Sequence, residues 1–489
     1  MKVKIKYLRD GDGEKAGKEI LMDREAAEMY LKEGNGLIEI LKEETPKEES
    51  ERLKKDYEEN KREYLFEEFS EKTDFLQIVE KFMEVQPIYY DEGQVWWFWN
   101  WKNRCWNRKD EIDLLNAIDN FTHFPSVNSW IKSSLLEAFK RIGRRNCPQK
   151  IKKTWIQFKS DFYDAETGEC IPSSPKYFST NPIPWRVGES EDTPNIDSLF
   201  EQWVGKDSAL SLYEIIAYCC LADYPIHRLF CFIGDGLNGK GSFLRLLSKF
   251  IGEENCCSTE LDILLSSRFE VTRLYKRLVC LMGETNFNEM KQTSMLKKLT
   301  GGDLIGFEFK NKLPFEEYNY AKILIATNNL PTTTDKTAGF YRRWMIFDFP
   351  NTFNEKLDII SLVPEMEFEN LAKKCLSILK ELLKKREFHK EGSIEERAKK
   401  FEEKSNPFEK FWRDHIDDGD PQSDIPSWEF AKRINEWCRE NKFRELSERT
   451  IADHLKQHQV QQVRLRKRWY ENDRAIEKQV RCWAGIKWR

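Results

Sequence analysis

The chain has 489 residues, which is too long for one ordinary domain and predicts two to four. Charged residues make up 34% of the chain, but the formal net charge is only −4, so the molecule as a whole is not a polycation and any polyanion site must be a local patch. The N-terminus lacks an apolar signal segment, and the most apolar window, residues 212–233, is interrupted by charged residues. We therefore expect a soluble, intracellular (cytoplasmic) protein with no membrane partner.

Residues 1–62 are expected to form a small N-terminal unit followed by a charged linker. Alternation of Val3, Ile5 and Tyr7 predicts a strand, with a helix after it. Residues 42–62 are almost all Glu, Lys and other polar residues. Opposite charges four positions apart in this run favour a solvated helix.

Residues 63–200 are expected to form an α+β domain. The run PIYYDEGQVWWFWNWKNRCW, residues 87–106, has two aromatic stretches that predict a β-hairpin or meander. Aromatic side chains can stack on nucleobases, but a packed sheet face is the favoured interpretation. Residues 155–185 are rich in turn residues and prolines and predict short strands.

The central part of the chain changes to an alternating pattern. Residues 196–228 are helical in pattern, and strands and helices alternate over residues 229–349. This alternation predicts an α/β fold with a parallel sheet and crossover helices. The domains expected from here on are an α/β core at 201–355, a charged helical segment at 356–405 and a C-terminal domain at 406–489.

The stretch FIGDGLNGKGSFLRLL, residues 232–247, is typical of a phosphate-binding loop between a strand and a helix. Glycines allow successive N–H groups to face phosphate oxygens, and the lysine and the helix dipole add positive charge. A glycine follows the lysine, where Ser or Thr normally holds Mg²⁺; the next serine either takes that role or only caps the helix. The expected nucleotide contacts are Gly234, Asp235, Gly236, Leu237, Asn238, Gly239, Lys240, Gly241 and Ser242.

Polar residues follow two later apolar strands. Glu284 ends the run LVCLMGE, and Asn328 ends the run AKILIATN. Ligands bind at the carboxyl ends of parallel strands, so Glu284 is a candidate for polarising a water and supporting Mg²⁺ with Ser242. Asn328 is a candidate for orienting that water or contacting the γ-phosphate.

The arginines Arg342 and Arg343 precede another apolar strand. Arginine can stabilise a transferring phosphoryl group, often from a neighbouring subunit. An ordinary surface ion pair is the alternative for either arginine alone.

In order and spacing, these motifs resemble superfamily 3 helicases of the poxvirus-like and phage or plasmid primase-helicase branch. The matching stretches are GDGLNGKGSF, RLVCLMGET, LKKLTGGDLI, AKILIATNNLP and DKTAGFYRRWMIFDFP. Weaker similarity extends the resemblance to roughly residues 70–489, including IQFKSDFYDAETGE, SPKYFSTNPIPW and VRCWAGIKWR. The resemblance implies a P-loop AAA+-like ATPase core, a hexameric ring with ATP and Mg²⁺ between subunits, and movement along one DNA strand.

The segment after the GGD turn departs from the family pattern. Members often carry an arginine there, whereas this chain has GFEFKNKLPF. By resemblance, residues 300–312 contain a hairpin that projects into the ring channel, where Lys310 and Lys312 would contact phosphates; a solvated charged loop is the alternative. No primase site can be placed before residue 70, so a separate primase or polymerase is a candidate partner.

The basic C-terminal segment has the pattern of a winged helix. A helical stripe capped by Ser447 precedes an alternating basic strand at 463–470 and a returning strand at 480–488. In such a domain the helix can enter the major groove while the wing contacts phosphates. A solvated face is the alternative to the predicted DNA contacts, which are Arg464, Arg466, Lys467 and Arg468.

Together these patterns predict an ATP-dependent DNA helicase that replicates a virus, plasmid or other mobile element. Its expected partners are single-stranded and forked double-stranded DNA and further copies of itself. The alternative is a nucleotide-switched DNA-binding replication initiator or regulator that unwinds nothing. A small-molecule phosphotransferase is disfavoured because no acceptor-binding region is evident.

Overall fold

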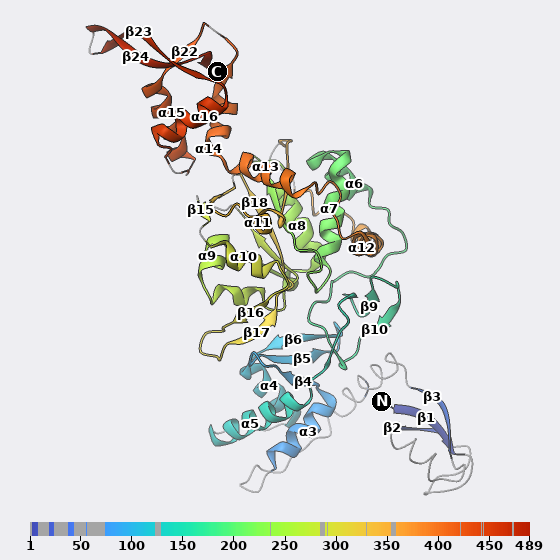
Figure 1. Cartoon of the computed structure of the whole chain (residues 1–489). Helices are drawn as coiled ribbons and strands as arrows, with labels where there is room; N and C mark the ends of the chain where they lie inside the picture. The colour runs from blue at the N-terminus through green and yellow to red at the C-terminus, as the bar shows by residue number, and fades with distance from the viewer. Residues whose placement is uncertain are drawn as a thin grey trace.

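The computed structural model describes residues 2–7, 19–23, 38–43, 55, 74–122, 129–234, 236–283, 289–290, 292–328, 330–353, 358–420, 422–441, 443, 445–471 and 474–489. In Figure 1 an aromatic-rich region, a central α/β region and a C-terminal domain follow one another along the molecule. None of the helices in these parts of the chain combines the length and the apolar composition needed to cross a membrane.

The expected N-terminal strand is confirmed. β1 (Lys2–Tyr7) pairs antiparallel with β2 (Glu19–Asp23) and β3 (Ile38–Glu43). Lys55 in the charged run is helical. The helix expected after β1, and the charged run beyond β3 apart from Lys55, lie outside the described residues.

A five-stranded sheet confirms the predicted α/β class. Every neighbouring pair of strands in it is parallel. Apart from the edge strand β13, its strands are short, mostly apolar runs that are largely buried, as expected for a parallel sheet covered by helices. In spatial order they are β13 (Cys256–Ser258), β14 (Val279–Met282), β18 (Lys322–Thr327), β12 (Leu229–Ile233) and β20 (Trp344–Asp348).

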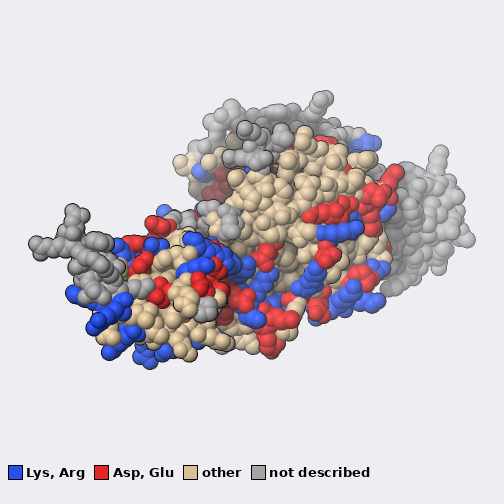
Figure 2. All heavy atoms as spheres, turned by 90° about the horizontal axis from the view of Figure 1, so that it is seen from above, with Lys and Arg blue, Asp and Glu red and all other residues tan. Residues whose placement is uncertain are grey.

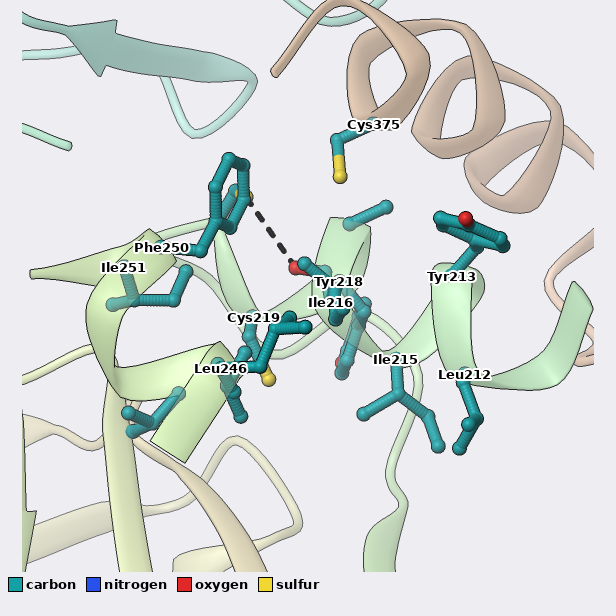
Figure 3. Close-up of a cluster of buried hydrophobic side chains, with 14 of the residues drawn as sticks. Leu212, Tyr213, Ile215, Ile216, Tyr218, Cys219, Leu246, Phe250, Ile251 and Cys375 are labelled. Atoms are coloured by element: carbon teal, nitrogen blue, oxygen red, sulfur yellow. Dashed lines mark hydrogen bonds between the residues drawn. The ribbon is translucent and has the colours of Figure 1, made fainter. Parts of the chain in front are cut away.

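Side chains of β12 alternate between two cores on opposite faces of this sheet. Phe230 and Phe232 belong to one core, whereas Leu229, Cys231 and Ile233 belong to the other. Figure 3 shows part of the first core, where side chains from three helices meet. Helices over the first face are α6 (Pro194–Val204), α7 (Lys206–Cys219), α8 (Lys240–Ile251) and α12 (Glu365–Lys385). Helices contributing to the second core are α9 (Leu261–Ser266), α10 (Thr293–Leu299), α11 (Ala338–Tyr341) and α13 (Ile394–Ser405).

The tryptophan-rich run forms the predicted antiparallel meander, and its rings are packed. Trp96 and Phe98 on one face of the middle strand join a local helical core, while Trp97 and Trp99 on the other face join the second core of the parallel sheet. The favoured interpretation of a packed sheet face is therefore confirmed. The elements of this region are α3 (Phe75–Val85), β4 (Ile88–Tyr90), β5 (Trp96–Asn100), β6 (Cys105–Lys109), α4 (Glu111–Thr122) and α5 (Ser129–Arg145).

Short strands occupy the turn-rich stretch, as predicted. Ile156 and Phe158 from this stretch belong to the same core as α6 and α12, and α6 runs through residues 200 and 201. The strands are β7 (Gln149–Lys150), β8 (Trp155–Phe158), β9 (Asp161–Asp164), β10 (Cys170–Pro172) and β11 (Tyr177–Phe178). Two further short strands, β15 (Glu289–Met290) and β19 (Thr332–Thr333), pair in parallel.

The C-terminal domain has a hydrophobic core of its own. The Ser447 hydroxyl accepts a hydrogen bond from the Thr450 N–H at 3.1 Å, which confirms the predicted helix cap. A three-stranded antiparallel sheet in the order β22-β24-β23 combines a short strand before α15 with the two long strands after α16. The elements are α14 (Pro407–His415), β21 (Ile416–Asp418), β22 (Asp424–Pro426), α15 (Ser427–Glu440), α16 (Glu448–Gln457), β23 (Gln461–Glu471), β24 (Arg474–Ala484) and β25 (Ile486–Trp488).

The first residue of β18, Lys322, is a buried amine. Its Nζ donates to the carbonyl oxygens of Leu221 and Asp223, at 2.7 Å in the second case, and lies over the Tyr218 ring. Burial lowers the pKa of Lys322 from 10.5 to about 8.

We expect this amine to make stability depend on pH. Between pH 8 and 10.5 the unfolded chain binds more protons at Lys322 than the folded chain, so the free energy of unfolding should rise with pH there. Relative to Lys322→Met, the rise should approach about 3 kcal/mol. Urea unfolding of both proteins below, within and above this window measures it. A difference between the two proteins that is the same at every pH would contradict the expectation.

Candidate functional site

The candidate phosphate loop connects the end of β12 to the start of α8. Gly239 has φ +91°, a left-handed conformation that favours glycine, and a Cβ there would lie 2.4 Å from Cδ1 of Trp203. A Cβ on Gly234 would lie 1.6 Å from Nδ2 of Asn238 and 2.7 Å from the Phe349 carbonyl oxygen. Both glycines are thus required by close approach of neighbouring groups. Asp235 lies outside the described residues.

The Lys240 amine lies at the centre of the loop. Its Nζ is 2.6 Å from the Gly234 carbonyl oxygen, 3.0 Å from Oδ1 of Asn238 and 3.2 Å from Oδ1 of Asn328. Asn238 also donates from Nδ2 to the Phe349 carbonyl at 3.3 Å. These three acceptors are neutral oxygens, and a phosphate oxygen can replace them with a stronger, charge-assisted bond.

Sheet order explains the contact between Lys240 and Asn328, which are 88 positions apart. β18 lies directly beside β12, and Ile233 is in register with Thr327. The next residue of each strand, Gly234 and Asn328, therefore leaves the same edge of the sheet. Two predicted site residues from separate motifs are brought together in this way.

The two residues after the lysine have different surroundings. Gly241 is exposed, and a Cβ there would meet no atom within 4 Å. Ser242, one position further round the helix, accepts a hydrogen bond at Oγ from Nη2 of Arg245 at 3.2 Å. At position 241, where such a loop normally has a Ser or Thr, there is thus no side chain and the space is open. The hydroxyl of the next residue, Ser242, is bonded to Arg245. Leu237 at the loop tip is exposed, and Gly236 has φ +108°.

Glu284 lies outside the described residues. β14 ends at Met282 and Gly283 follows it. Because β14 is parallel to β18 and adjacent to it, the chain leaves β14 at the sheet edge where Asn328 lies. The role predicted for Glu284 stays a prediction.

The two predicted arginines differ in their surroundings. Arg343 is 6% exposed, and its guanidinium donates from Nε to Oγ1 of Thr300 at 3.0 Å and from Nη2 to the Lys297 carbonyl at 3.1 Å. It also donates to the Gly339 carbonyl. Burial, and then the neighbouring Arg342, lower the pKa of Arg343. Arg343 thus points into its own subunit, where it ties β20 to α10 and α11.

Arg342 is exposed, and the structure gives its side chain no hydrogen bond or ion pair with any described residue. Both arginines precede β20, whereas the candidate phosphate loop follows β12, which is parallel to β20. A five-residue strand spans about 16 Å, so neither arginine lies with Lys240 of the same chain.

The predicted hairpin is present, and its tip packs against the meander. β16 (Leu304–Phe307) and β17 (Phe315–Tyr318) are antiparallel. The Lys312 amine donates to the Gln94 carbonyl, and burial followed by the nearby Arg108 lowers the pKa of Lys312. Lys310 is exposed. Of the two predicted lysines, only Lys310 has a side chain directed to solvent.

In the C-terminal hairpin, Arg464 and Arg466 have exposed side chains. Lys467 and Arg468 lie in β23, and their side chains lie outside what the structure describes. Figure 2 shows Lys and Arg side chains gathered at the end of the molecule that carries this domain.

One residue that contacts the candidate site could not be predicted from any pattern in the sequence. Trp203 supports the loop from beneath Gly239 and is 1% exposed. It belongs to α6, 36 positions before Gly239, and nothing in the apolar pattern of that helix distinguishes it from other core residues.

Part of this region matches a known family. Residues 232–343, from the end of β12 to Arg343, match the family described as "Family of unknown function (DUF5906)". The match covers less than a quarter of the chain and assigns no activity.

Among solved structures, the chain is similar to the NrS-1 C-terminal region. One structure of that region in its A form without ligand matches at 13% identity with a TM-score of 0.43, covering 85% of this chain and 100% of the other. A second matches at 13% identity with a TM-score of 0.42 and the same coverage. These values are too low to carry an argument about fold or function.

Proposed function

We propose that this chain is an ATP-dependent DNA helicase with a P-loop AAA+-like core and a winged-helix DNA-binding domain, serving replication of a virus, plasmid or other mobile element. The observation that carries the proposal is the contact between Nζ of Lys240 and Oδ1 of Asn328 at the end of two adjacent parallel strands. A lysine in a crowded glycine loop, with a polar residue from the next strand beside it, is the arrangement that a triphosphate site requires.

The loop residues fit a nucleotide triphosphate. Lys240 supplies the positive charge, and the first N–H groups of α8 have no partner within the helix. Asn328 lies where it can contact the terminal phosphate or hold the attacking water. When bound, ATP supplies the free energy of its cleavage; this chain binds and orients the phosphates.

We propose that magnesium accompanies the nucleotide. The Ser242 hydroxyl faces Arg245, and Glu284 is outside the described residues. Ser242 and Glu284 are the residues that would hold a magnesium ion, and the ion would supply positive charge beside the phosphates.

We propose that Arg342 acts on the phosphate site of a neighbouring copy in a hexameric ring. Arg342 is exposed and lies at the opposite end of the sheet from its own Lys240, which favours action across an interface. Arg343 stabilises the segment that carries Arg342 through its buried hydrogen bonds to α10 and α11. The proposed DNA contacts are Lys310, Arg464, Arg466, Lys467 and Arg468, with Lys312 retained only as a support of the hairpin.

We expect substitutions of the two arginines to have different effects on stability and on ATP turnover. Arg343→Gln should lower the free energy of unfolding by about 2–4 kcal/mol, because a buried network loses its donors. Arg342→Ala should leave the unfolding free energy within about 0.5 kcal/mol of wild type and abolish ATP turnover.

Mixing Arg342→Ala with Lys240→Ala protein should restore part of that turnover, because some interfaces then pair an intact loop with an intact arginine. Steady-state ATPase assays over a range of mixing ratios measure this. Mixtures that never exceed the sum of the separate activities would show that Arg342 does not act across an interface.

A strand-displacement assay on a forked duplex with ATP tests the function itself. Wild type should release the labelled strand, while Lys240→Ala should bind the fork and release nothing. Wild-type protein that hydrolyses ATP on DNA yet never displaces a strand would overturn the helicase proposal.

The second candidate function is a nucleotide-switched initiator that unwinds nothing. The variant Glu284→Gln separates this function from that of a helicase. Loss of DNA-stimulated hydrolysis together with unwinding supports a motor, whereas retained DNA function with tight nucleotide binding supports a switch.

A further inference from the structure

One face of the C-terminal hairpin is directed toward the start of α15. Gln462 donates from Nε2 to Oγ of Ser427, the first residue of α15, at 3.1 Å. Gln462 is in register with Trp483, which belongs to the domain core. Since side chains alternate along a strand, Arg464 and Arg466 lie on this same face, further along the hairpin.

Like charges are placed opposite one another on this face. Arg464 is in direct register with Arg481 on the neighbouring strand, and both side chains are exposed. The structure gives neither arginine an ion pair with any described residue. Equal charges in directly opposed positions destabilise a strand pair, so this arrangement indicates a ligand that supplies negative charge.

The neighbouring helix α16 has a different charge pattern. Its exposed side chains alternate in sign, with Glu448 and Asp453 beside Arg449 and Lys456. The two carboxylates repel phosphates at the surface where a recognition helix would approach DNA. The hairpin, rather than α16, therefore has the charge that suits a phosphate backbone.

An exposed indole stands at the base of the hairpin. Trp428, the second residue of α15, is 55% exposed, although Trp412 and Trp483 of the same domain are buried in its core. It follows Ser427, which Gln462 contacts. Arg464 is two residues along the strand from Gln462, about 7 Å away. The exposed indole thus belongs to the helix start that the arginine-bearing face of the hairpin contacts through Gln462.

We propose that Trp428 and the hairpin arginines Arg464, Arg466 and Arg481 form a binding site for the junction between double- and single-stranded DNA. The arginines contact backbone phosphates of the duplex, and the indole stacks on the first unpaired base. This inference rests on the proposed DNA substrate and adds where and how that DNA is held. It assigns binding to the hairpin and α15, with no base reading by α16.

Equilibrium binding without nucleotide tests the site on the full chain. Two fluorescent DNAs are compared by anisotropy: a fork with two single-stranded arms and a blunt duplex of the same paired sequence. Trp428→Ala should weaken fork binding about 5- to 150-fold and leave blunt-duplex binding unchanged, because only the fork offers an unpaired base. Trp428→Phe should restore most of the fork affinity. The matched control is Trp130→Ala, a tryptophan of α5 that is 50% exposed.

The arginines are tested by salt dependence on the same DNAs. Arg464→Ala and Arg481→Ala should each reduce the slope of log affinity against log salt concentration by about one on both DNAs. Arg449→Ala on α16 should leave the slope unchanged.

Three results would overturn the inference. They are equal fork affinity for wild type and Trp428→Ala, an equal loss on fork and blunt duplex, and a larger slope change for Arg449→Ala than for the hairpin variants. Failure here leaves the ATP site untouched, since ATP turnover without DNA is measured separately and should be normal in Trp428→Ala.

Discussion

Replacing Lys240 by alanine is expected to reduce ATP turnover by at least about a hundredfold. The amine supplies the positive charge closest to the expected phosphates, and removal of one preorganised donor from such a site costs two to three orders of magnitude in rate. Steady-state phosphate release, with and without single-stranded DNA, measures the loss. Lys380→Ala, an exposed lysine of α12, is the matched control and should behave as wild type.

Asn328 provides a second test of the same site. Because its Oδ1 is 3.2 Å from the Lys240 amine, the two substitutions should not be additive. The double variant Lys240→Ala with Asn328→Ala should be barely slower than Lys240→Ala alone. Turnover by Lys240→Ala within threefold of wild type would remove the basis for assigning the loop to ATP.

The largest effect on stability is expected from Glu391→Gln. The Glu391 carboxylate, 8% exposed, accepts from Nε of Arg228 at 2.8 Å and from the backbone N–H of Phe388 at 3.0 Å. Nη2 of Arg228 and Nη1 of Arg397 also donate to it. Neutralising the carboxylate leaves two guanidinium groups without their counter-ion, so the free energy of unfolding should fall by about 3–5 kcal/mol.

Chemical unfolding followed by far-ultraviolet circular dichroism measures this change. Glu403→Gln is the matched control: its carboxylate is exposed on the same helix as Arg397 and lies 3.9 Å from Lys399, and its loss should cost less than about 0.5 kcal/mol. A decrease below about 1 kcal/mol for Glu391→Gln would mean that the buried triad does not hold α13 against the start of β12.

Local patterns in the sequence were sufficient for the elements around the site. Unbroken apolar runs ending in polar residues predict buried parallel strands, and these runs form β12, β14 and β18. The alternating aromatic run predicts a packed meander, and Ser447 predicts a helix start. Each of these signals is carried by residues within about ten positions of one another, where chain geometry alone relates them.

Contacts between distant segments were decided by the tertiary structure. The order of strands places Asn328 beside Lys240, and packing against α10 and α11 turns Arg343 inward while Arg342 stays at the surface. Packing of the hairpin on the meander likewise leads the Lys312 amine to bond the Gln94 carbonyl, so that it is not directed to solvent.

The sequence by itself determined which residues carry charge, glycine freedom or apolar surface, and therefore where a glycine-rich loop after a strand and a parallel sheet would form. It did not determine which of two adjacent arginines is exposed, or that the hairpin contacts the start of α15 through Gln462 and Ser427. Those outcomes depend on how separate hydrophobic faces bury one another, and the burial is set by residues dozens of positions away.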